Sequence, residues 1–474
     1  MMIWGWIAQS GLLAQTLQTG LIFDEEEYAA EPLKKQVLQR NYENLPLVAS
    51  LKSSCPMPQD QGEFANCVGW AVAYAARTIL EAQQQQGKDQ ASITAQAFSP
   101  DFLYLMTKLA ADERCQKGIS FGKALKLLQE QGVPRRSALA STCNVALAQQ
   151  LQPQASANRI EGYTRLFDQE APADLRIKTI KKALSQQKPV VVGIECYESF
   201  KNAKEFWQVV KDKFIGGHAL CVVGYDDTRD AFEVMNSWGT NWGNAGFTWI
   251  RYQDFAEVVK YAYELNPSTN QHAVTTTTST NTVLSGALEM TLASGAPIPI
   301  LANNNSPTRG VVVKKVQTET TGTQYQTQQG YPSGTRYRLY LTNEQPIYAY
   351  VLASDLTGAV GLVFPPDAQT SPYLSYAGNA IALPDESWYL EMDQTVGTDF
   401  LAVLYSTKPL DMTAMVAQLN QSKEHLPKKL TALLDSQAIP TNDVTYSNDR
   451  IAFRASTKDP QKNLVITLIA MPHL

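Results

Sequence analysis

Cysteines and histidines are the residues of this chain that could carry nucleophilic chemistry. Six cysteines lie at positions 55, 67, 115, 143, 196 and 221, and four histidines lie at 218, 272, 425 and 473. Cys67 stands where the polar turn QGEFAN enters an apolar, helix-like segment, a place where a cysteine is ordinarily a small buried hydrophobe. It becomes a nucleophile only when a histidine or a helix N-terminus stabilises its thiolate. None of the spacings is the paired CxxC of a zinc site, so no metal is expected.

His218 is the histidine whose sequence surroundings favour a role as the base for the Cys67 thiol. It lies in GGHALCVVGYDD, where two glycines open a β-branched run, whereas the other histidines fall in polar segments or at the C-terminus. An imidazole that shares a proton with a thiol needs its second ring nitrogen fixed by an acceptor. A side-chain amide oxygen can do this without adding charge. Asn236, in NSWGTNWGNAGF, is the candidate acceptor.

With these three residues inside their extended motifs, the chain resembles the papain-like cysteine peptidases over about residues 44–265. The run NSWGTNWGNAGF carries the most specific part of the resemblance, and HALCVVGYDD and LPLVASL add to it. The resemblance implies that Cys67, His218 and Asn236 hydrolyse peptide bonds without a cofactor. It also implies that Gln61 and the backbone N–H of Cys67 form the oxyanion hole. A helix that begins at the cysteine would favour both the thiolate and the oxyanion.

Three further residues take substrate-binding roles from the same resemblance. Gly118 ends CQKG, which resembles the family's Cys-x-Gly-Gly loop and is implied to pair with the substrate backbone. Trp238 is implied to shield the bond between Asn236 and His218 from water. Ala219, directly after the histidine, is grouped with these two. A peptide or protein is therefore the expected substrate.

Several positions depart from the family pattern. Val68 replaces the usual tryptophan, with Trp70 two places later, and Phe64 replaces a cysteine that normally pairs within the disulfide-rich loop. The resemblance then implies Cys143 as the disulfide partner of Cys115. The family's long inhibitory propeptide has no room ahead of the matching region, so any latency is expected to work differently. These departures concern substrate preference and disulfides and leave the catalytic set complete.

The elements that must position these residues are predicted to be helices first and strands second. Apolar residues at three-to-four spacing predict a helix from Cys67 to about Gln85. SPDFLYLMTKL, capped by Ser99, and SFGKALKLLQEQG, ended by Gly132, predict two more. From PVVVGIECY onward, β-branched and aromatic runs broken by glycines predict strands. The order predicts an α+β fold, which the resemblance specifies as a two-lobed papain-like fold with a helical left lobe and a β-sheet right lobe.

Composition divides the chain into two domains. Residues 266–282 are nearly all small and polar, and they predict a Thr-rich linker after a peptidase domain at 44–265. Residues 283–474 carry short apolar runs between Pro, Gly and Asp, which predicts an all-β, sandwich-like domain with one polar helix at about 409–435. This part resembles accessory domains of bacterial peptidases, and we expect it to bind a surface or a protein partner. Truncation after residue 268 is expected to leave hydrolysis of small peptides within a few-fold of the full chain.

The N-terminal residues and the overall composition indicate location and partners. Residues 1–20 are uncharged and partly apolar, so they form a candidate signal segment, and 21–43 form a short polar lead-in. With 40 basic and 45 acidic side chains, no charge excess points to nucleic acid, and no segment reaches membrane-spanning length. The candidate signal segment and disulfide predict an extracellular or cell-envelope protein.

Two other functions fit parts of the pattern. A papain fold without catalysis could be a binding module, but such proteins usually lose the cysteine, histidine or glutamine that are all present here. A thiol amidase or acyltransferase acting on cell-wall peptide would use the same triad, since that arrangement recurs on related folds. The NSWG run favours the cysteine peptidase over both.

Overall fold

The structure is a computed structural model that describes residues 17–85, 89–267, 282–303 and 322–474. The first compact unit comprises the residues up to Ala29 together with 46–269, and the second comprises 30–45 together with 270–474. Most of the candidate signal segment and of the predicted linker lie outside the described residues, so both stay predictions. The predicted lead-in contributes to both units, because its residues from position 30 onward pack with the C-terminal half.

The first unit begins with helices, as predicted. The residue that opens the longest of them is Cys67, and Ser99 caps another by accepting a hydrogen bond from the backbone N–H of Phe102 at 3.2 Å. The helices are α1 (Glu25–Ala30), α3 (Cys67–Gly69), which continues through a π-helical stretch (Trp70–Arg77) into α4 (Thr78–Gln84), α5 (Gln90–Ala95), α6 (Pro100–Thr107), α7 (Phe121–Glu130), α8 (Val145–Gln149), α9 (Gln152–Ala155), α10 (Ala173–Ser185) and α11 (Tyr252–Val258).

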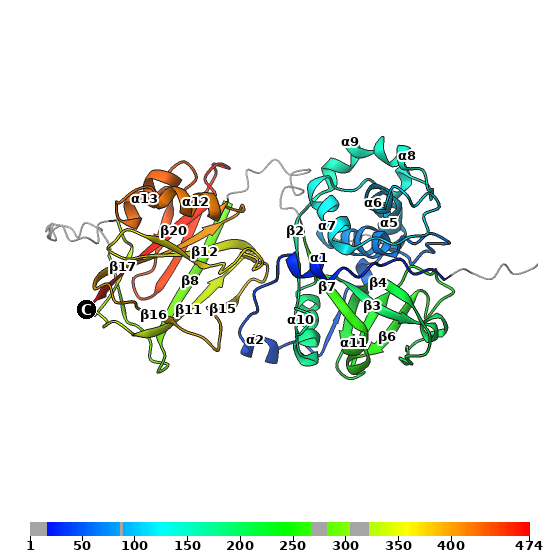
Figure 1. The fold of residues 1–474 in the computed structure, drawn as a ribbon, viewed down its shortest axis with the longest axis horizontal. Helices are drawn as coiled ribbons and strands as arrows, with labels where there is room; N and C mark the ends of the chain where they lie inside the picture. Colours follow the sequence, from blue (N-terminus) through cyan, green and yellow to red (C-terminus); the bar gives the residue numbers. More distant parts are fainter. Residues whose placement is uncertain (1–16, 86–88, 268–281, 304–321) are drawn as a thin grey trace, which may run out of the picture. The chain divides into compact units, whose positions relative to one another are not determined.

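An antiparallel sheet forms the second half of the first unit. Figure 1 shows its strands β3, β4 and β6 on one side of this unit and the helices α6, α7 and α8 on the opposite side. The strand order is β2-β7-β3-β4-β5-β6, with β1 paired to β4. The strands are β1 (Val48–Ser50), β2 (Ile160–Arg165), β3 (Val190–Tyr197), β4 (Phe214–Asp226), β5 (Ala231–Met235), β6 (Phe247–Arg251) and β7 (Val259–Pro267). Helices and sheet share one core, which confirms the α+β prediction.

One detail of β4 differs from the prediction. The two glycines before His218 were expected to open the strand, but β4 begins at Phe214, so both lie inside it. Gly216 has φ +126, a conformation that side chains other than glycine rarely adopt. The glycines therefore interrupt the regular strand just before the histidine.

The second unit consists of two sheets packed face to face, as the sandwich-like prediction requires. One has the order β13-β12-β17-β20-β10-β9 with β14 beside β12, and the other has the order β15-β11-β8-β19-β18 with β16 beside β11. Their inner faces share a core. The strands are β8 (Thr282–Leu292), β9 (Ile300–Ala302), β10 (Tyr325–Thr327), β11 (Arg336–Asn343), β12 (Ile347–Ser354), β13 (Val360–Phe364), β14 (Tyr373–Leu374), β15 (Asn379–Leu383), β16 (Leu390–Glu391), β17 (Gly397–Ser406), β18 (Val444–Tyr446), β19 (Ile451–Thr457) and β20 (Leu464–His473).

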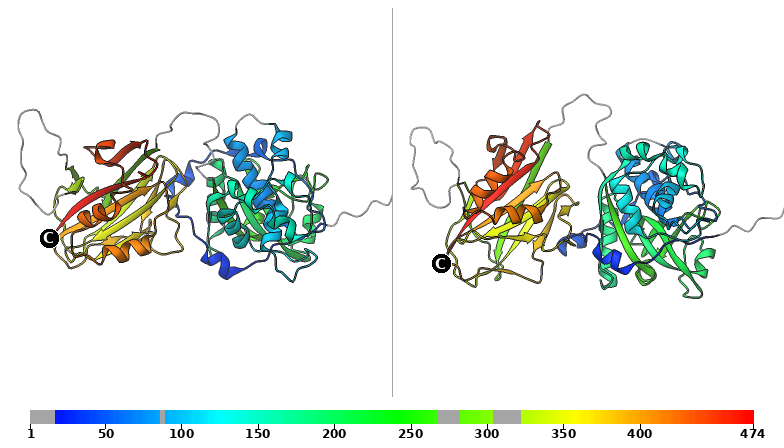
Figure 2. Two further views of the ribbon diagram at one scale, coloured as in Figure 1. Left: turned by 90° about the horizontal axis from the view of Figure 1, so that it is seen from above. Right: turned by 45° about the horizontal axis from the view of Figure 1, so that its top comes forward.

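The single polar helix predicted at about 409–435 is wrong, because this stretch forms two helices. They are α12 (Met412–Leu419) and α13 (Leu426–Leu434), and they pack on the sheet that contains β12, β17 and β20. Both views in Figure 2 show these orange helices beside that sheet. Pro427 lies in the first turn of α13, where its missing N–H costs nothing, whereas the interior of one long helix would not accept it. No helix among the described residues is long and apolar enough to cross a bilayer.

Candidate active site

Cys67 is placed by the start of α3. It is the first residue of the helix, and its side chain is fully buried. The preceding residue, Asn66, is also buried and donates a hydrogen bond from Nδ2 to Oδ1 of Asp101 at 2.9 Å. Backbone N–H groups at a helix start are unpaired within the helix and stabilise negative charge there. Cys67 therefore begins a helix, as predicted from the sequence.

His218 and Asn236 meet across two neighbouring strands. The Nε2 atom of His218, in β4, lies 2.7 Å from Oδ1 of Asn236, which directly follows β5. The other ring nitrogen, Nδ1, is buried and has no hydrogen-bond partner among the described residues. Trp238 covers the ring, with 4.7 Å between ring centroids, and Phe200 and Trp242 pack against Trp238. This aromatic cluster excludes water from the hydrogen bond between His218 and Asn236.

Gln61 is held rigidly beside the same motif. Its backbone N–H donates to the carbonyl oxygen of Ser237 at 2.8 Å, and the Ser237 hydroxyl donates to Gln61 Oε1 at 2.6 Å. The Gln61 Nε2 group donates to the carbonyl oxygen of Phe64 at 2.8 Å, so its second N–H can point to an oxyanion. Ser237 is not among the residues predicted from the sequence, although it lies inside the NSWG run. Its position directly after Asn236 was the available signal.

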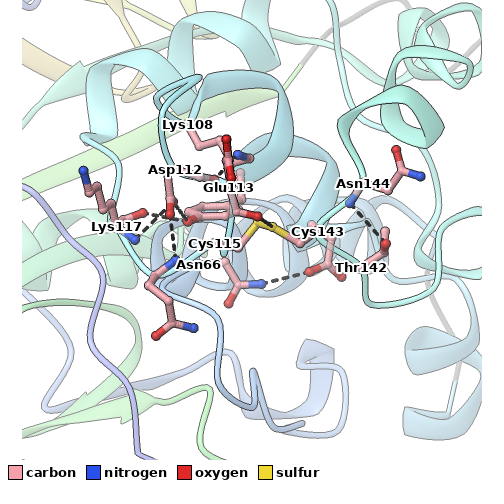
Figure 3. Close-up of a disulfide and its surroundings, with 12 residues drawn as sticks. Asn66, Lys108, Asp112, Glu113, Cys115, Lys117, Thr142, Cys143 and Asn144 are labelled. Carbon is pink, nitrogen blue, oxygen red and sulfur yellow. Dashed lines mark hydrogen bonds between the residues drawn. A yellow bond between two sulfur atoms is a disulfide. The ribbon is translucent and has the colours of Figure 1, made fainter.

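The disulfide predicted between Cys115 and Cys143 is present, with a Cα–Cα distance of 5.9 Å. Figure 3 shows it beside Asp112 and Lys117. Oδ2 of Asp112 accepts hydrogen bonds from the Tyr104 hydroxyl at 2.7 Å and from the Lys117 backbone N–H at 3.1 Å. The loop that leads to Gly118 is therefore fixed both covalently and by a buried carboxylate.

A segment near the N-terminus, residues 17–23, lies over these residues; we call it the covering segment. The backbone N–H groups of Gly20 and Leu21 donate to the carbonyl oxygen of Gly217, directly before His218, at 3.2 and 3.0 Å. Ile119 donates its N–H to the carbonyl oxygen of Gly20 at 3.0 Å and accepts one from Ile22 at 3.0 Å. The covering segment is thus hydrogen-bonded on both sides, in the manner of an added strand.

Two of the predicted substrate-binding residues, Trp238 and Gly118, lie next to this segment. The Trp238 indole N–H donates to the carbonyl oxygen of Gln18 at 2.8 Å. A Cβ on Gly118 would lie 2.1 Å from the carbonyl oxygen of Gly20, so only glycine permits this approach. Ala219 supplies a backbone group that hydrogen-bonds the Cys67 sulfur. Ile119, directly after Gly118, forms the backbone hydrogen bonds to the covering segment, and the pairing of Gly118 with a substrate backbone stays a prediction.

Burial controls the charge of both members of the proposed catalytic pair. It raises the pKa of the Cys67 thiol to about 12, although backbone hydrogen bonds from Ala219, Val68, Cys67 itself and Gly20 act in the opposite direction. It lowers the pKa of His218 to about 4, against the effect of the hydrogen bond that the ring donates to Asn236. With the covering segment in place, both groups are therefore neutral at pH 7.

Comparisons with known proteins agree with this arrangement. The model of the papain family cysteine proteases matches residues 53–265, and a model of a domain of unknown function, DUF4384, matches residues 330–409. An uncharacterized peptidase C1-like protein of Acanthamoeba polyphaga mimivirus is 26% identical over 234 residues, which cover 44% of this chain and 70% of that protein.

Other cysteine proteinases match this chain over shorter stretches. Cathepsin B-like cysteine proteinase 6 of Caenorhabditis elegans is 36% identical over 74 residues, which cover 15% of this chain and 20% of that protein. Among solved structures, xylellain, a cysteine protease from Xylella fastidiosa, aligns with a TM-score of 0.42 and 21% identity and covers 53% of this chain and 95% of its own. The match to the family model assigns residues 53–265 to the papain family of cysteine proteases, whose reaction is the hydrolysis of peptide bonds, and the α+β arrangement of the first unit agrees with this assignment.

Proposed function

We propose that this protein hydrolyses peptide bonds with Cys67 as nucleophile and His218 as its base. His218 removes the thiol proton, and the thiolate attacks the carbonyl carbon of the substrate to form a tetrahedral oxyanion. The imidazolium then protonates the leaving amine, and water hydrolyses the resulting thioester to release the acid and restore the thiol. The observation that carries the proposal is the buried 2.7 Å contact between His218 Nε2 and Asn236 Oδ1, which leaves Nδ1 for the thiol.

Stabilisation of the oxyanion is assigned to two donors. One is the backbone N–H of Cys67 at the helix start, and the other is the Nε2 group of Gln61. Ser237 supports this role because its hydroxyl donates to Gln61 Oε1 and so fixes which end of the amide carries the donors. Removing one oxyanion donor typically lowers turnover by about 100- to 1000-fold, so Gln61 is a strong test of the mechanism.

The state with the covering segment in place is a latent one. Gly20 contacts the thiol and occupies backbone hydrogen-bonding positions beside Gly217 and Ile119. A substrate needs the same space to reach Cys67, whose side chain is fully buried here. The covering segment must therefore leave before hydrolysis can begin.

A single substitution can release the enzyme without touching the catalytic residues. A Cβ at Gly20 would lie 2.2 Å from the backbone carbonyl oxygen of Ala65, so Gly20→Val should expel the covering segment and raise hydrolysis of a fluorogenic peptide. Gly361→Val is the matched control, because a Cβ there meets no atom within 4 Å. Equal activity of Gly20→Val and the wild type would contradict the latent state.

The released enzyme then allows the catalytic assignment to be tested. In the Gly20→Val background, Cys67→Ala should abolish hydrolysis and His218→Ala nearly so, whereas Asn236→Ala should cost less because it orients the base. Cys196→Ala, at another buried free cysteine, is the control and should retain activity. Hydrolysis by the Cys67→Ala variant at the rate of its parent would refute the mechanism.

The disulfide also indicates the compartment in which the protein occurs. A disulfide between Cys115 and Cys143 persists in oxidising compartments, which supports an extracellular or cell-envelope protein. The thiol state of protein taken from its natural compartment tests this, and finding both cysteines free would contradict it.

A further inference from the structure

The first part of the chain is attached to both units. The covering segment lies in the first unit, and α1 follows it, with the Tyr28 hydroxyl donating to the carbonyl oxygen of Phe167 at 2.7 Å and its ring stacked on Tyr261 at 4.2 Å between centroids. Residues 30–45, which we call the strap, belong to the second unit, and the chain returns to the first unit at Pro46. The strap therefore connects the N-terminal part of the first unit, which ends at Ala29, with the rest of that unit, which resumes at Pro46.

Apolar side chains of the strap are part of the interior of the second unit. Val37 is 5% exposed and belongs to the core between the two sheets. Leu38 is 4% exposed and packs with Ala380 and Ala382 of β15. Burial of this extent is found in a structural element, not in a loose connection.

Backbone and charged groups add to this attachment. Leu33 pairs in parallel with Thr370, and its carbonyl oxygen accepts the Ser371 N–H at 2.8 Å. The N–H of Leu38 donates to the carbonyl oxygen of Ala380 at 3.0 Å. The ammonium of Lys34 lies 3.1 Å from the centroid of the Tyr376 ring, a cation–π contact. Thr370, Ser371, Tyr376 and Ala380 all lie within the region that matches the domain of unknown function.

We propose that the second unit is the anchor of the covering segment: it binds the strap, and through the strap it keeps residues 17–23 over the catalytic residues. The inference rests on the proposed function and gives the second unit a regulatory role at the same site. Because the strap and the covering segment belong to one peptide, a bound strap keeps the local concentration of the covering segment high. A covering segment that dissociates therefore rebinds quickly. Loosening the strap from the second unit is the step that opens the protease.

The anchor makes a distinctive prediction about a cut chain. Glu43 and Asn44 are exposed at the end of the strap, so a recognition sequence for a site-specific protease can be inserted between Asn44 and Leu45. Cutting there removes the covalent link between the covering segment and the protease domain but leaves the strap bound to the second unit. The N-terminal fragment should stay in the complex, and Cys67 should stay protected.

Alkylation of Cys67 by iodoacetamide, followed by peptide mapping, measures that protection without requiring catalysis. The buried free cysteines Cys55, Cys196 and Cys221 serve as internal reporters, since they stay unlabelled while the first unit is folded. After the cut, Cys67 of the otherwise native chain should react within about threefold of its uncut rate. In cut Leu38→Asp or Lys34→Ala chains, the fragment should leave on size exclusion and labelling should rise by about 100-fold or more.

A matched control and two opposite outcomes make the test decisive. Glu43→Gln changes an exposed strap residue and should behave as the native strap does. Thermal melting of the uncut Lys34→Ala chain verifies that the second unit is folded. The anchor is refuted if the native fragment leaves on cutting and exposes Cys67, or if both strap variants retain it as firmly as the control. A released chain that is labelled at Cys67 but does not hydrolyse peptides refutes the proposed function and leaves the anchor standing.

Discussion

At the scale of single residues, the covering segment sets the chemistry of Cys67 through burial. A thiol with a pKa of about 12 beside an imidazole with a pKa of about 4 cannot form the thiolate–imidazolium pair that attacks a carbonyl carbon. Both shifts have burial as their largest cause, so exposure to water reverses both. Removal of the segment is therefore expected both to expose Cys67 and to allow the thiolate–imidazolium pair of Cys67 and His218 to form.

The pH dependence of alkylation reports this change directly. In Gly20→Val the burial that raises the thiol pKa is relieved, so the iodoacetamide reaction of Cys67 should reach half of its maximal rate several pH units below the wild-type value. Gly361→Val should follow the wild type. A Gly20→Val profile that coincides with the wild type would contradict the assignment of burial as the cause.

Ser237 is expected to act as a positioning residue. Ser237→Ala removes the hydroxyl that donates to Gln61 Oε1 and should lower kcat of the released enzyme while leaving KM nearly unchanged, because only the oxyanion donor is disturbed. Steady-state kinetics in the Gly20→Val background would measure the split. Gln61→Ala should lower kcat more, by about 100- to 1000-fold. An increase in KM alone for Ser237→Ala would argue for a substrate contact.

Asp101 gives a stability prediction with a definite sign. Burial raises its pKa from 3.8 to about 6, with Arg136 and Asn66 acting against the rise. A folded-state pKa above the unfolded value means that the contribution to stability is complete below about pH 4 and is lost as the pH rises through 6. At 1.36 kcal/mol per pKa unit, Asp101→Asn should gain roughly 3 kcal/mol relative to wild type between pH 4 and pH 7.5.

Denaturant unfolding at the two pH values measures the effect. Asp174→Asn, at an exposed position of α10, is the control for the substitution of a carboxylate by an amide. Because Asp101 holds Asn66 next to the nucleophile, activity of the released enzyme should be recorded in parallel. The assignment fails if the two variants respond equally to pH.

The proposed catalytic residues could be selected from the sequence because each lies in a short run whose neighbours also contact the site. Asn236, for example, is followed by Ser237 and Trp238, which hold Gln61 and cover His218. The covering segment could not be predicted in this way. Gly20 and Leu21 bind through backbone N–H groups that every sequence possesses, and their partner Gly217 is far away along the chain. No side-chain pattern marks such pairing.

At the scale of elements, the loop closed by the disulfide positions one side of the site. The bond joins cysteines separated by 28 residues, and loop-entropy arguments assign it about 3 to 4 kcal/mol of stability. Replacing both Cys115 and Cys143 by serine should lower the free energy of unfolding by that amount and raise KM of the released enzyme, because Gly118 and Ile119 lose their fixed position. Denaturant unfolding and steady-state kinetics measure the two effects. A reduced wild type should match the double variant.

The order of the elements was predictable, and their interruptions were less so. The helix from Cys67, the cap at Ser99 and the strands after residue 189 follow from periodicity and capping. The split into α12 and α13 depends on Pro427 and on packing against one sheet, which a polar composition conceals. The strap was interpreted as a lead-in because the partners of Val37 and Leu38 lie in the other half of the chain.

At the scale of the whole molecule, deletion of the second unit tests whether that unit is a passive tethered module or the anchor of the covering segment. A chain that ends at residue 269 keeps the strap but loses everything that the strap packs against. A passive module predicts hydrolysis of a small peptide within a few-fold of the full chain, whereas an anchor predicts that the truncated chain is faster. A truncated chain that also lacks residues 1–45 provides the upper limit. Activity of the truncated chain at or below that of the full chain would favour the module.

The burial of Val37 also has a consequence for the order of events on the ribosome. The core that contains Val37 also includes Ile469 and Met471, so this core is not complete until nearly the last residue has been made. The protease domain is complete long before, and at about 5–20 residues per second the delay amounts to tens of seconds. During synthesis, the nascent protease must be restrained by the covering segment without its anchor, so newly made chains are the population in which premature self-digestion is to be sought.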